Sequence, residues 1–241
     1  MQQVIFKDLG LIDYRSAWDY QEKLLAANVS VKTSNRNDPE NAELNPTKHH
    51  FLLCEHNPVY TLGKSGDIKN VLMSEGELSK NNIEFFRTNR GGDITFHGTG
   101  QIVGYPILDL EKYYTDIGKY LRNLEEIIII TLAEYGIAGE RSQGETGVWL
   151  DPGIKGRERK ICAIGVRCSR WITMHGFALN VNTDLSYFNN IIPCGISHKQ
   201  VTSLEKELGI TQDFDEIKGK IKNNFLKVFD AYFITEKSLQ L

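Results

Sequence analysis

Residues 161–181, ICAIGVRCSRWITMHGFALNV, decide the fold. Two apolar runs, 161–166 and 174–181, have the length and composition of buried strands. The polar stretch 167–170 between them is typical of a hairpin turn. A further short apolar run, 147–150, comes just before them. Consecutive hairpins are therefore expected to build part of a sheet.

Helices are expected on either side of this sheet. Apolar residues recur at steps of three or four from Ile117 to Tyr135, and Gly136 fits the end of that helix. Weaker amphipathic patterns predict helices at 14–27 and 217–232. Further strands are predicted at 50–55, 85–87 and 102–110, the last near an edge or a bend because it contains Pro106. The fold class is therefore α/β (α+β), a mixed sheet flanked by helices.

The composition is that of one folded unit. The chain has 241 residues, of which 41% are hydrophobic and 24% charged, which excludes a disordered or fibrous protein. Neither a repeat nor a linker divides it, so we expect a single catalytic domain over residues 1–241. Residues 28–48 are rich in Asn, Ser, Thr, Asp and Pro, which predicts an exposed excursion.

Charge and hydropathy exclude several classes of partner. The formal net charge is −3, whereas a polyanion binder normally has a basic excess, so we expect no nucleic-acid partner. No apolar stretch approaches the roughly 20 residues that cross a bilayer, so no membrane partner is expected. The first residues lack the pattern of a signal peptide, which predicts a cytoplasmic protein.

The densest polar motif is RGGDITFHGTGQ at residues 90–101. Its glycines allow the backbone to approach a ligand closely, and it lies between two predicted strands. It matches neither of the glycine-rich nucleotide-binding patterns, so no nucleotide cofactor is expected. A plain turn is the alternative interpretation.

Three further features carry reactive groups. Lys160 begins the strand motif KICAIG, and residues 175–182 read HGFALNVN. Cys194 lies between a proline and a glycine, in a constrained turn that packing alone does not explain. The other cysteines are expected to be reduced thiols: Cys54 and Cys162 lie inside apolar runs, and Cys168 lies in a polar turn. The group His49, His50, Cys54 and His56 fits no standard zinc spacing, so no metal is expected.

These motifs together resemble the lipoyl(octanoyl) transferase family. The resemblance covers residues 90–101, 160–165, 175–182, 193–195 and 201–204, in the family's order. It implies a fold shared with the catalytic domains of biotin protein ligase and lipoate–protein ligase. It also implies transfer of an octanoyl group from octanoyl-acyl carrier protein to a lysine of its acceptors, the lipoyl domains of 2-oxoacid dehydrogenases and the glycine-cleavage H protein.

The resemblance also implies residue roles. Cys194 matches the acyl-thioester nucleophile, and Lys160 matches the lysine that activates it. Three segments match those that surround the acyl substrate: Arg90, Gly91, Gly92, Asp93, Ile94, Thr95, Phe96 and His97; Ala163, Ile164 and Gly165; and Gly176, Phe177 and Ala178. The chain departs from the family pattern at Ala163, where Ser or Thr is frequent, and at Ile192, where Asn is usual.

The implied chemistry is physically reasonable. Only a thiolate attacks a thioester, and a nearby ammonium lowers the cost of ionising a thiol. Once the thiol is acylated, the same lysine can accept the proton of the incoming amine. The oxyanion donors remain open between the 91–92 loop and the turn after Pro193. Arg157, Arg159, Arg167 and Arg170 are expected either to dock the acidic carrier protein or to form a solvated hairpin.

Two other functions are kept open. An ATP-dependent lipoate or biotin ligase on the same fold would not need the cysteine. A non-catalytic binder of lipoyl domains or acyl carrier protein would need neither Cys194 nor Lys160.

Overall fold

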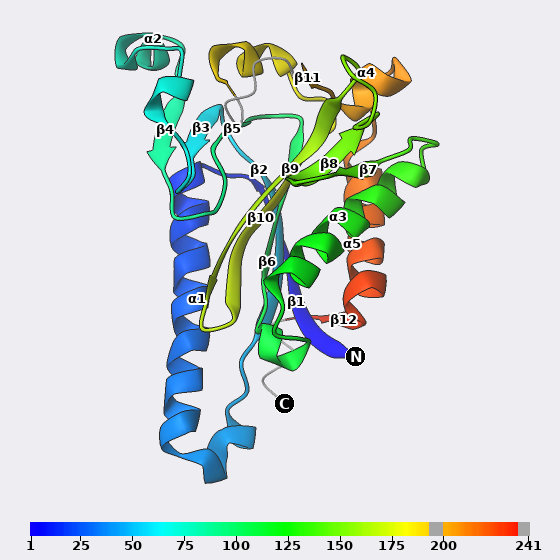
Figure 1. Cartoon of the computed structure of the whole chain (residues 1–241). Helices are drawn as coiled ribbons and strands as arrows, with labels where there is room; N and C mark the ends of the chain where they lie inside the picture. The colour runs from blue at the N-terminus through cyan, green and yellow to red at the C-terminus, as the bar shows by residue number, and fades with distance from the viewer. Residues whose placement is uncertain (193–199, 236–241) are drawn as a thin grey trace.

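A computed structural model describes residues 1–192 and 200–235, except for the side chains of 41 and 42. Its main sheet is mixed and runs in the order β12-β1-β2-β6-β10-β9-β8-β7, with β11 pairing on β9 (Figure 1). The strands of this sheet are β1 (Gln2–Leu11), β2 (His49–Glu55), β6 (Gln101–Ile107), β7 (Glu140–Ser142), β8 (Glu145–Leu150), β9 (Arg159–Ser169), β10 (Ile172–Asn180), β11 (Gln200–Val201) and β12 (Ala231–Ile234).

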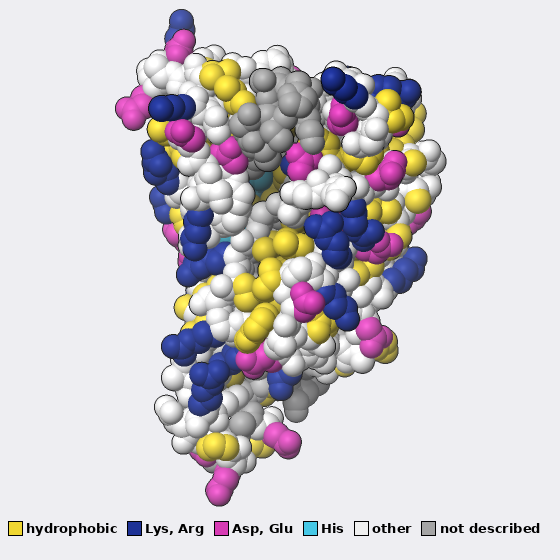
Figure 2. All heavy atoms as spheres, viewed as in Figure 1, with side chains coloured by type: hydrophobic (Ala, Val, Ile, Leu, Met, Phe, Trp, Pro, Cys, Tyr) yellow, Lys and Arg dark blue, Asp and Glu magenta, His cyan; other side chains and the backbone are white. Residues whose placement is uncertain are grey.

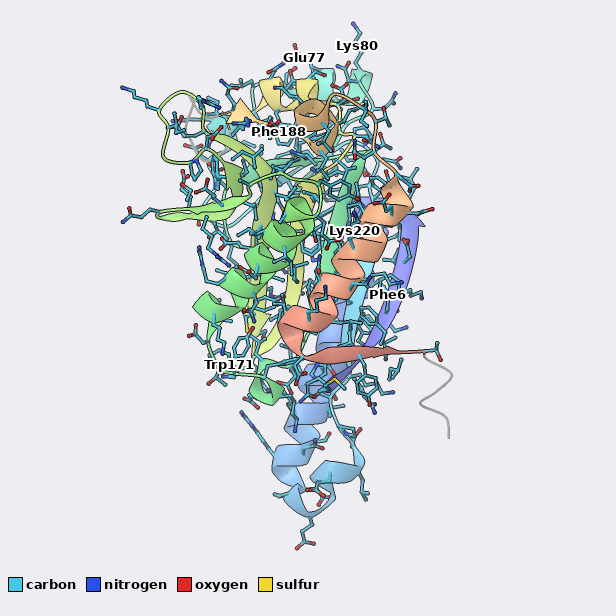
Figure 3. The ribbon with its side chains drawn as sticks, turned by 90° about the vertical axis from the view of Figure 1, so that its right-hand side faces the viewer. Phe6, Glu77, Lys80, Trp171, Phe188 and Lys220 are labelled. Atoms are coloured by element: carbon cyan, nitrogen blue, oxygen red, sulfur yellow. The ribbon has the colours of Figure 1, made fainter. Side chains whose placement is uncertain are left out.

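Helices cover both faces of this sheet. The long α1 (Tyr14–Asn37) lies on one face, and α3 (Ile117–Ala133) and α5 (Phe214–Phe229) lie on the other, side by side in Figure 3. The core between α5 and the sheet includes the stacked rings of Phe51 and Phe225, whose centroids are 4.2 Å apart. Each of the three helices begins after an aspartate that caps a free backbone N–H of the first turn: Asp13, Asp116 and Asp213.

A second, small sheet lies above one end of the main sheet. It has the order β4-β3-β5 and consists of β3 (Val59–Leu62), β4 (Glu84–Arg87) and β5 (Ile94–His97). Two short helices complete the fold, α2 (Glu75–Lys80) and α4 (Leu204–Leu208). The predicted fold class is therefore confirmed: the chain forms a mixed sheet flanked by helices. No helix within the described ranges is both long and apolar enough to cross a bilayer.

Two details of the predicted strands were wrong. The turn of the central hairpin is not 167–170: β9 continues to Ser169, and the chain reverses at Arg170 and Trp171, which both have positive φ. Of the edge or bend predicted for the strand with Pro106, the edge is excluded, because β6 pairs with β2 on one side and β10 on the other. Pro106 fits inside the sheet because Gly176 on β10 has no side chain; a Cβ there would lie 2.8 Å from the proline Cδ.

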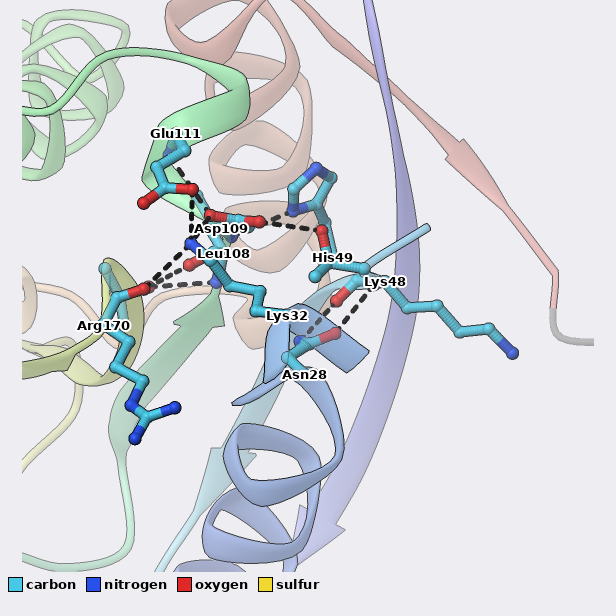
Figure 4. A network of polar contacts seen from close by, with 10 residues as sticks. Asn28, Lys32, Lys48, His49, Leu108, Asp109, Glu111 and Arg170 are labelled. Carbon is cyan, nitrogen blue, oxygen red and sulfur yellow. Dashed lines mark hydrogen bonds and ion pairs between the residues drawn. The ribbon is translucent and has the colours of Figure 1, made fainter. Parts of the chain in front are cut away.

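The prediction of an exposed excursion at 28–48 was right for most of its residues, since 30, 33–34, 36–40, 43–46 and 48 are exposed, but it missed the helix in its first part. The helix α1 continues to Asn37, and Asn28 is buried, with its side chain hydrogen-bonded to both the N–H and the carbonyl of Lys48. Lys32 is buried too (Figure 4). Its Nζ lies 2.9 Å from Asp109 Oδ1 and 2.8 Å from Glu111 Oε2, and it donates to the carbonyl of Arg170. These polar side chains tie the helix to the main sheet, which is why a polar stretch can be ordered.

Candidate active site

A cavity of about 590 Å³ lies where the small sheet meets β9 and β10. The face shown in Figure 2 is hollowed there, and hydrophobic side chains gather along the hollow. The cavity brings together the three sequence segments that the family resemblance singled out. Its lining includes Lys160 and the predicted residues Arg90, Gly91, Gly92, Asp93, Ile94, Thr95, His97, Ala163, Ile164, Gly165, Gly176, Phe177 and Ala178.

Phe96 is the predicted substrate-binding residue that does not line this cavity. It alternates with Thr95 and His97 along β5, so its side chain points to the other side of that strand. Its ring is 1% exposed and stacks on Tyr187 at a centroid distance of 4.5 Å. In this position Phe96 packs the core of the small sheet.

The loop that follows β4 packs over β9. The N–H of Gly91 donates to the carbonyl of Val166 at 2.9 Å. This approach requires Gly165 on β9, because a Cβ there would lie 2.9 Å from the carbonyl oxygen of Gly91. Arg90 extends across the same space, and its Nη2 donates to Thr61 Oγ1 at 2.9 Å. Gly91 of the 90–101 motif and Gly165 of the 160–165 motif therefore allow the same close contact between the loop and β9.

A buried hydrogen-bond network continues from this arginine along the cavity. His97 Nε2 lies 3.3 Å from Thr61 Oγ1, and His97 Nδ1 lies 2.8 Å from Gln101 Oε1. Since Gln101 uses its amide nitrogen to donate to Asn180 Oδ1, its oxygen must accept, and His97 donates from Nδ1. Burial lowers the pKa of His97 to about 3, so the ring is neutral at pH 7.

The network ends at the strand that bears Lys160. Asn180 Nδ2 donates to the carbonyl of Thr202 at 3.0 Å, and the Thr202 N–H donates to the carbonyl of Lys160 at 3.0 Å. Val201, which precedes this threonine, pairs with Lys160 across β11 and β9. The cavity-side polar groups of β5, β6 and β10 are therefore connected to the backbone at Lys160.

Lys160 lies at the cavity with its ammonium over an aromatic ring. Its Nζ is 4.5 Å from the ring centroid of Trp149 on the adjacent strand β8, within range of a cation–π interaction. Gly147 on β8 lies beside the lysine stem: a Cβ at that glycine would be in ordinary van der Waals contact with Lys160 Cε, at 3.5 Å. The geometry places one amine at a mostly apolar cavity.

Cys194, the predicted nucleophile, lies outside the described residues. The described chain stops at Ile192, whose N–H donates to the carbonyl of Asn70, and resumes at Gln200, next to the Val201–Lys160 pair. Cys54 and Cys162 are fully buried, and burial raises the pKa of both thiols. Burial also raises the pKa of the half-buried Cys168. None of these three has the activated environment of a nucleophilic thiol.

Sequence reasoning missed the part of the cavity lining that consists of Tyr14, Val103 and Tyr105. Tyr14 comes from the first turn of α1, far from the motifs, where it counted only as part of an apolar helix face. It also missed Ile117 and Leu121, which belong to α3 and line another part of the cavity. These residues are apolar wall, and an apolar side chain gives no sequence signal that separates a wall from a core.

The four predicted docking arginines do not form one cluster. Arg157 lies in the turn before β9 and Arg159 begins that strand. Both pair with Asp151, and Arg159 also binds Glu207 through two nitrogens. Arg167 pairs with Glu22 near the other end of the strand. At about 3.3 Å per residue, the ends of this strand are roughly 30 Å apart. The expected docking surface is therefore wrong as a single patch, and several of its charges are neutralised within the chain.

Within the described ranges, no group of three His, Cys, Asp or Glu side chains is arranged to hold a metal ion. Two histidines of the 49–56 group have protein partners: His49 Nδ1 accepts from the N–H of Asp109, and His56 binds the carbonyl of Ile12 and the hydroxyl of Tyr105.

Comparisons with known proteins identify the family of the chain. A model of the "Lipoyl protein ligase A/B catalytic domain" family matches residues 13–226. An octanoyltransferase of Christiangramia forsetii is 57% identical over 231 residues, which are 95% of this chain and 97% of that protein.

Solved structures support the fold alone. A bipartite lipoate protein ligase of Thermoplasma acidophilum has a TM-score of 0.65 at 16% identity, covering 99% of this chain and 89% of that one. A biotin protein ligase of Aquifex aeolicus has a TM-score of 0.50 at 13% identity, covering 95% and 71%. The family model and the identity to octanoyltransferases are decisive: the chain belongs to the lipoyl protein ligase A/B catalytic domain family and, within it, to the octanoyltransferases, which are acyltransferases.

Proposed function

We propose that this chain, acting as one catalytic domain in the cytoplasm, transfers an octanoyl group from acyl carrier protein to a lysine of a lipoyl domain through an acyl-thioester on Cys194. One observation supports this most strongly: a lysine amine, Lys160, lies at an apolar cavity that the family's three substrate segments line. An acyl chain is the ligand that such a cavity suits, because each buried methylene contributes about 0.8 kcal/mol.

In the first half-reaction, Cys194 gives its thiol proton to Lys160, and its sulfur attacks the thioester carbonyl of the donor. A carbon–sulfur bond to Cys194 forms, and the bond to the carrier's thiol breaks. The departing sulfur takes up the proton. His97 is neutral at the cavity, and its Nδ1–H is already donated to Gln101, so we assign it to positioning.

In the second half-reaction, the acceptor lysine must lose a proton before it can attack. Its ordinary pKa near 10.4 makes this cost roughly 4.6 kcal/mol at pH 7. We assign the base to Lys160, because the neutral thioester of Cys194 no longer favours its charged form. The new amide bond forms and the carbon–sulfur bond breaks. Of the two protons that the acceptor ammonium loses, one goes to the sulfur of Cys194 and the other passes through Lys160 to solvent.

The acceptors that we propose are lipoyl domains of 2-oxoacid dehydrogenases and the glycine-cleavage H protein. This assignment is supported by the chain's membership of the octanoyltransferases. Arg90 to His97, Ala163 to Gly165 and Gly176 to Ala178 are proposed to contact the acyl group, apart from Phe96, which supports β5 from behind.

A transfer assay without ATP tests the proposal. Octanoyl-acyl carrier protein and a lipoyl domain are incubated with the wild type, with Cys194→Ser and with the matched control Cys168→Ser. We expect the lipoyl domain to gain octanoyl groups with the wild type and with Cys168→Ser, and Cys194→Ser to lose this activity. Transfer that requires ATP and survives Cys194→Ser would instead indicate a ligase. An inert wild type that still binds the partners would indicate a non-catalytic binder.

A further inference from the structure

Two buried tyrosines, Tyr14 and Tyr105, form part of the cavity lining, and their position points to a length check. We propose that Tyr14, on the far side of β6 from the lysine strand, ends the path of the acyl chain and thereby selects chains of about eight carbons. This inference rests on the proposed function and adds a specificity-determining residue to the same site.

The register of three strands defines the path. Ala163 on β9 pairs with Ala178 on β10, and Ala178 pairs with Val103 on β6. All three line the cavity, so its floor crosses the sheet from small residues to a larger one. Neighbouring strands are about 4.8 Å apart, which makes the crossing about 10 Å long. An extended eight-carbon chain has seven carbon–carbon bonds of about 1.5 Å in a zigzag and is roughly 9 Å long.

Beyond Val103 the cavity is lined by Tyr14 and Tyr105, which are 2% and 3% exposed. The next residue in the row is Cys54 on β2, which pairs with Val103 and is fully buried. A chain that follows the floor therefore reaches an aromatic wall after two strand spacings.

This wall is rigid. The Tyr14 ring lies parallel to that of His97, with centroids 5.9 Å apart, and it contacts the rings of His56 at 5.3 Å and Phe86 at 5.2 Å. His56 is itself held by the carbonyl of Ile12. With rings packed on several sides, Tyr14 cannot rotate away to admit a longer chain, because close-packed side chains have no free space to turn into.

The part of the cavity next to α3 is less suited to limit the length of an acyl chain. It is lined by Ile117 and Leu121 from α3 and by Ile164 and Val166 from β9, all of which are partly exposed. A chain lying there would continue into solvent and meet no stop. The part lined by Tyr14 and Tyr105 is the one whose length can select among acyl groups.

The test measures kcat/KM for hexanoyl-, octanoyl-, decanoyl- and dodecanoyl-acyl carrier protein. The wild type is expected to prefer octanoyl. Tyr14→Ala is expected to raise the decanoyl-to-octanoyl ratio about fifteenfold, since each methylene that gains a buried position contributes roughly a factor of four. Tyr20→Ala is the matched control, because it removes a tyrosine from the same helix at a position that does not line the cavity.

Val103→Ala provides a second, gentler variant if Tyr14→Ala does not fold. It should raise the same ratio by a smaller factor. An unchanged ratio in the folded variants, with octanoyl transfer retained, would overturn the role of Tyr14 and leave the proposed function standing. If only Leu121→Ala raised the decanoyl-to-octanoyl ratio, the acyl chain would lie in the part of the cavity lined by α3. This result would also overturn the proposed role of Tyr14. Failure of the wild type to transfer any acyl group would refute the proposed function itself.

Discussion

Gly147 shows how one missing side chain lets two strands pair closely next to Lys160. Its φ is +122°, and a Cβ there would lie 2.6 Å from the carbonyl oxygen of Cys162 on β9. Glu125, buried on α3, accepts a hydrogen bond from the Gly147 N–H and is held by Arg122 and Arg141. These contacts fix the backbone of β8 at Gly147, next to the stem of Lys160.

Removing the amine while keeping the stem tests the role of Lys160. Lys160→Met should slow both acylation of the enzyme and acyl transfer to the lipoyl domain by at least 100-fold, the usual range for a lost general acid–base group. Single-turnover kinetics of each half-reaction measure this. Lys155→Met is the control, because Lys155 is exposed in the turn before β9. Equal rates in the two variants would contradict the role.

The sequence singled out many of the residues that line the cavity and missed what connects them. The glycines and polar residues of 90–101 could be singled out because such residues rarely cluster without a functional reason. The opposite orientation of Phe96 could not, since both faces of β5 are covered and no hydrophobic alternation distinguishes them. The link from Asn180 to Thr202 joins positions 22 residues apart, and only the fold brings them together.

At the scale of elements, α1 illustrates how tertiary contacts override local composition. Asn, Ser and Thr are weak helix formers, which is why a helix end near Ala27 was predicted. The buried amide of Asn28 and the buried ammonium of Lys32 instead bind backbone and carboxylate groups of neighbouring strands and loops. Amphipathic helices with apolar contacts, such as α3, were predicted well because their stabilising contacts appear in the sequence pattern.

The contacts of Lys32 are expected to stabilise the fold without affecting turnover. Lys32→Met leaves the carboxylate of Asp109, which is 2% exposed, buried without its cation, and should lower the free energy of unfolding by about 3 kcal/mol. Urea denaturation measures the change. Arg36→Met, one turn further along α1 and exposed, should change it by less than about 0.5 kcal/mol. A matching fall in turnover at a temperature where the variant is folded would contradict the separation.

At the scale of the whole molecule, buried histidines make stability depend on pH. Burial lowers the pKa of His49 and His56 to about 4 and that of His97 and His175 to about 3. Below the unfolded pKa of about 6.5, the unfolded chain binds protons that the folded chain does not. Their stabilising contribution is therefore complete above that pH and declines as the pH falls toward the folded values.

The expected loss between pH 7.5 and 5.5 is about 1.3 kcal/mol per histidine, or roughly 5 kcal/mol for the four. Urea denaturation at pH 7.5 and 5.5 measures it. His97→Gln should reduce the loss by one histidine's share. A free energy of unfolding that is equal at the two pH values would refute this account of the buried imidazoles.

The central claim is that the acyl group passes through the protein as a covalent intermediate. Its most direct test is intact-protein and peptide mass spectrometry after brief mixing with octanoyl-acyl carrier protein, followed by addition of a lipoyl domain. We predict one octanoyl group on the peptide that contains Cys194, and its loss as the same mass appears on the lysine of the lipoyl domain. Octanoylation of the lipoyl domain with no adduct ever detectable on Cys194, or an adduct that the domain does not remove, would contradict the account.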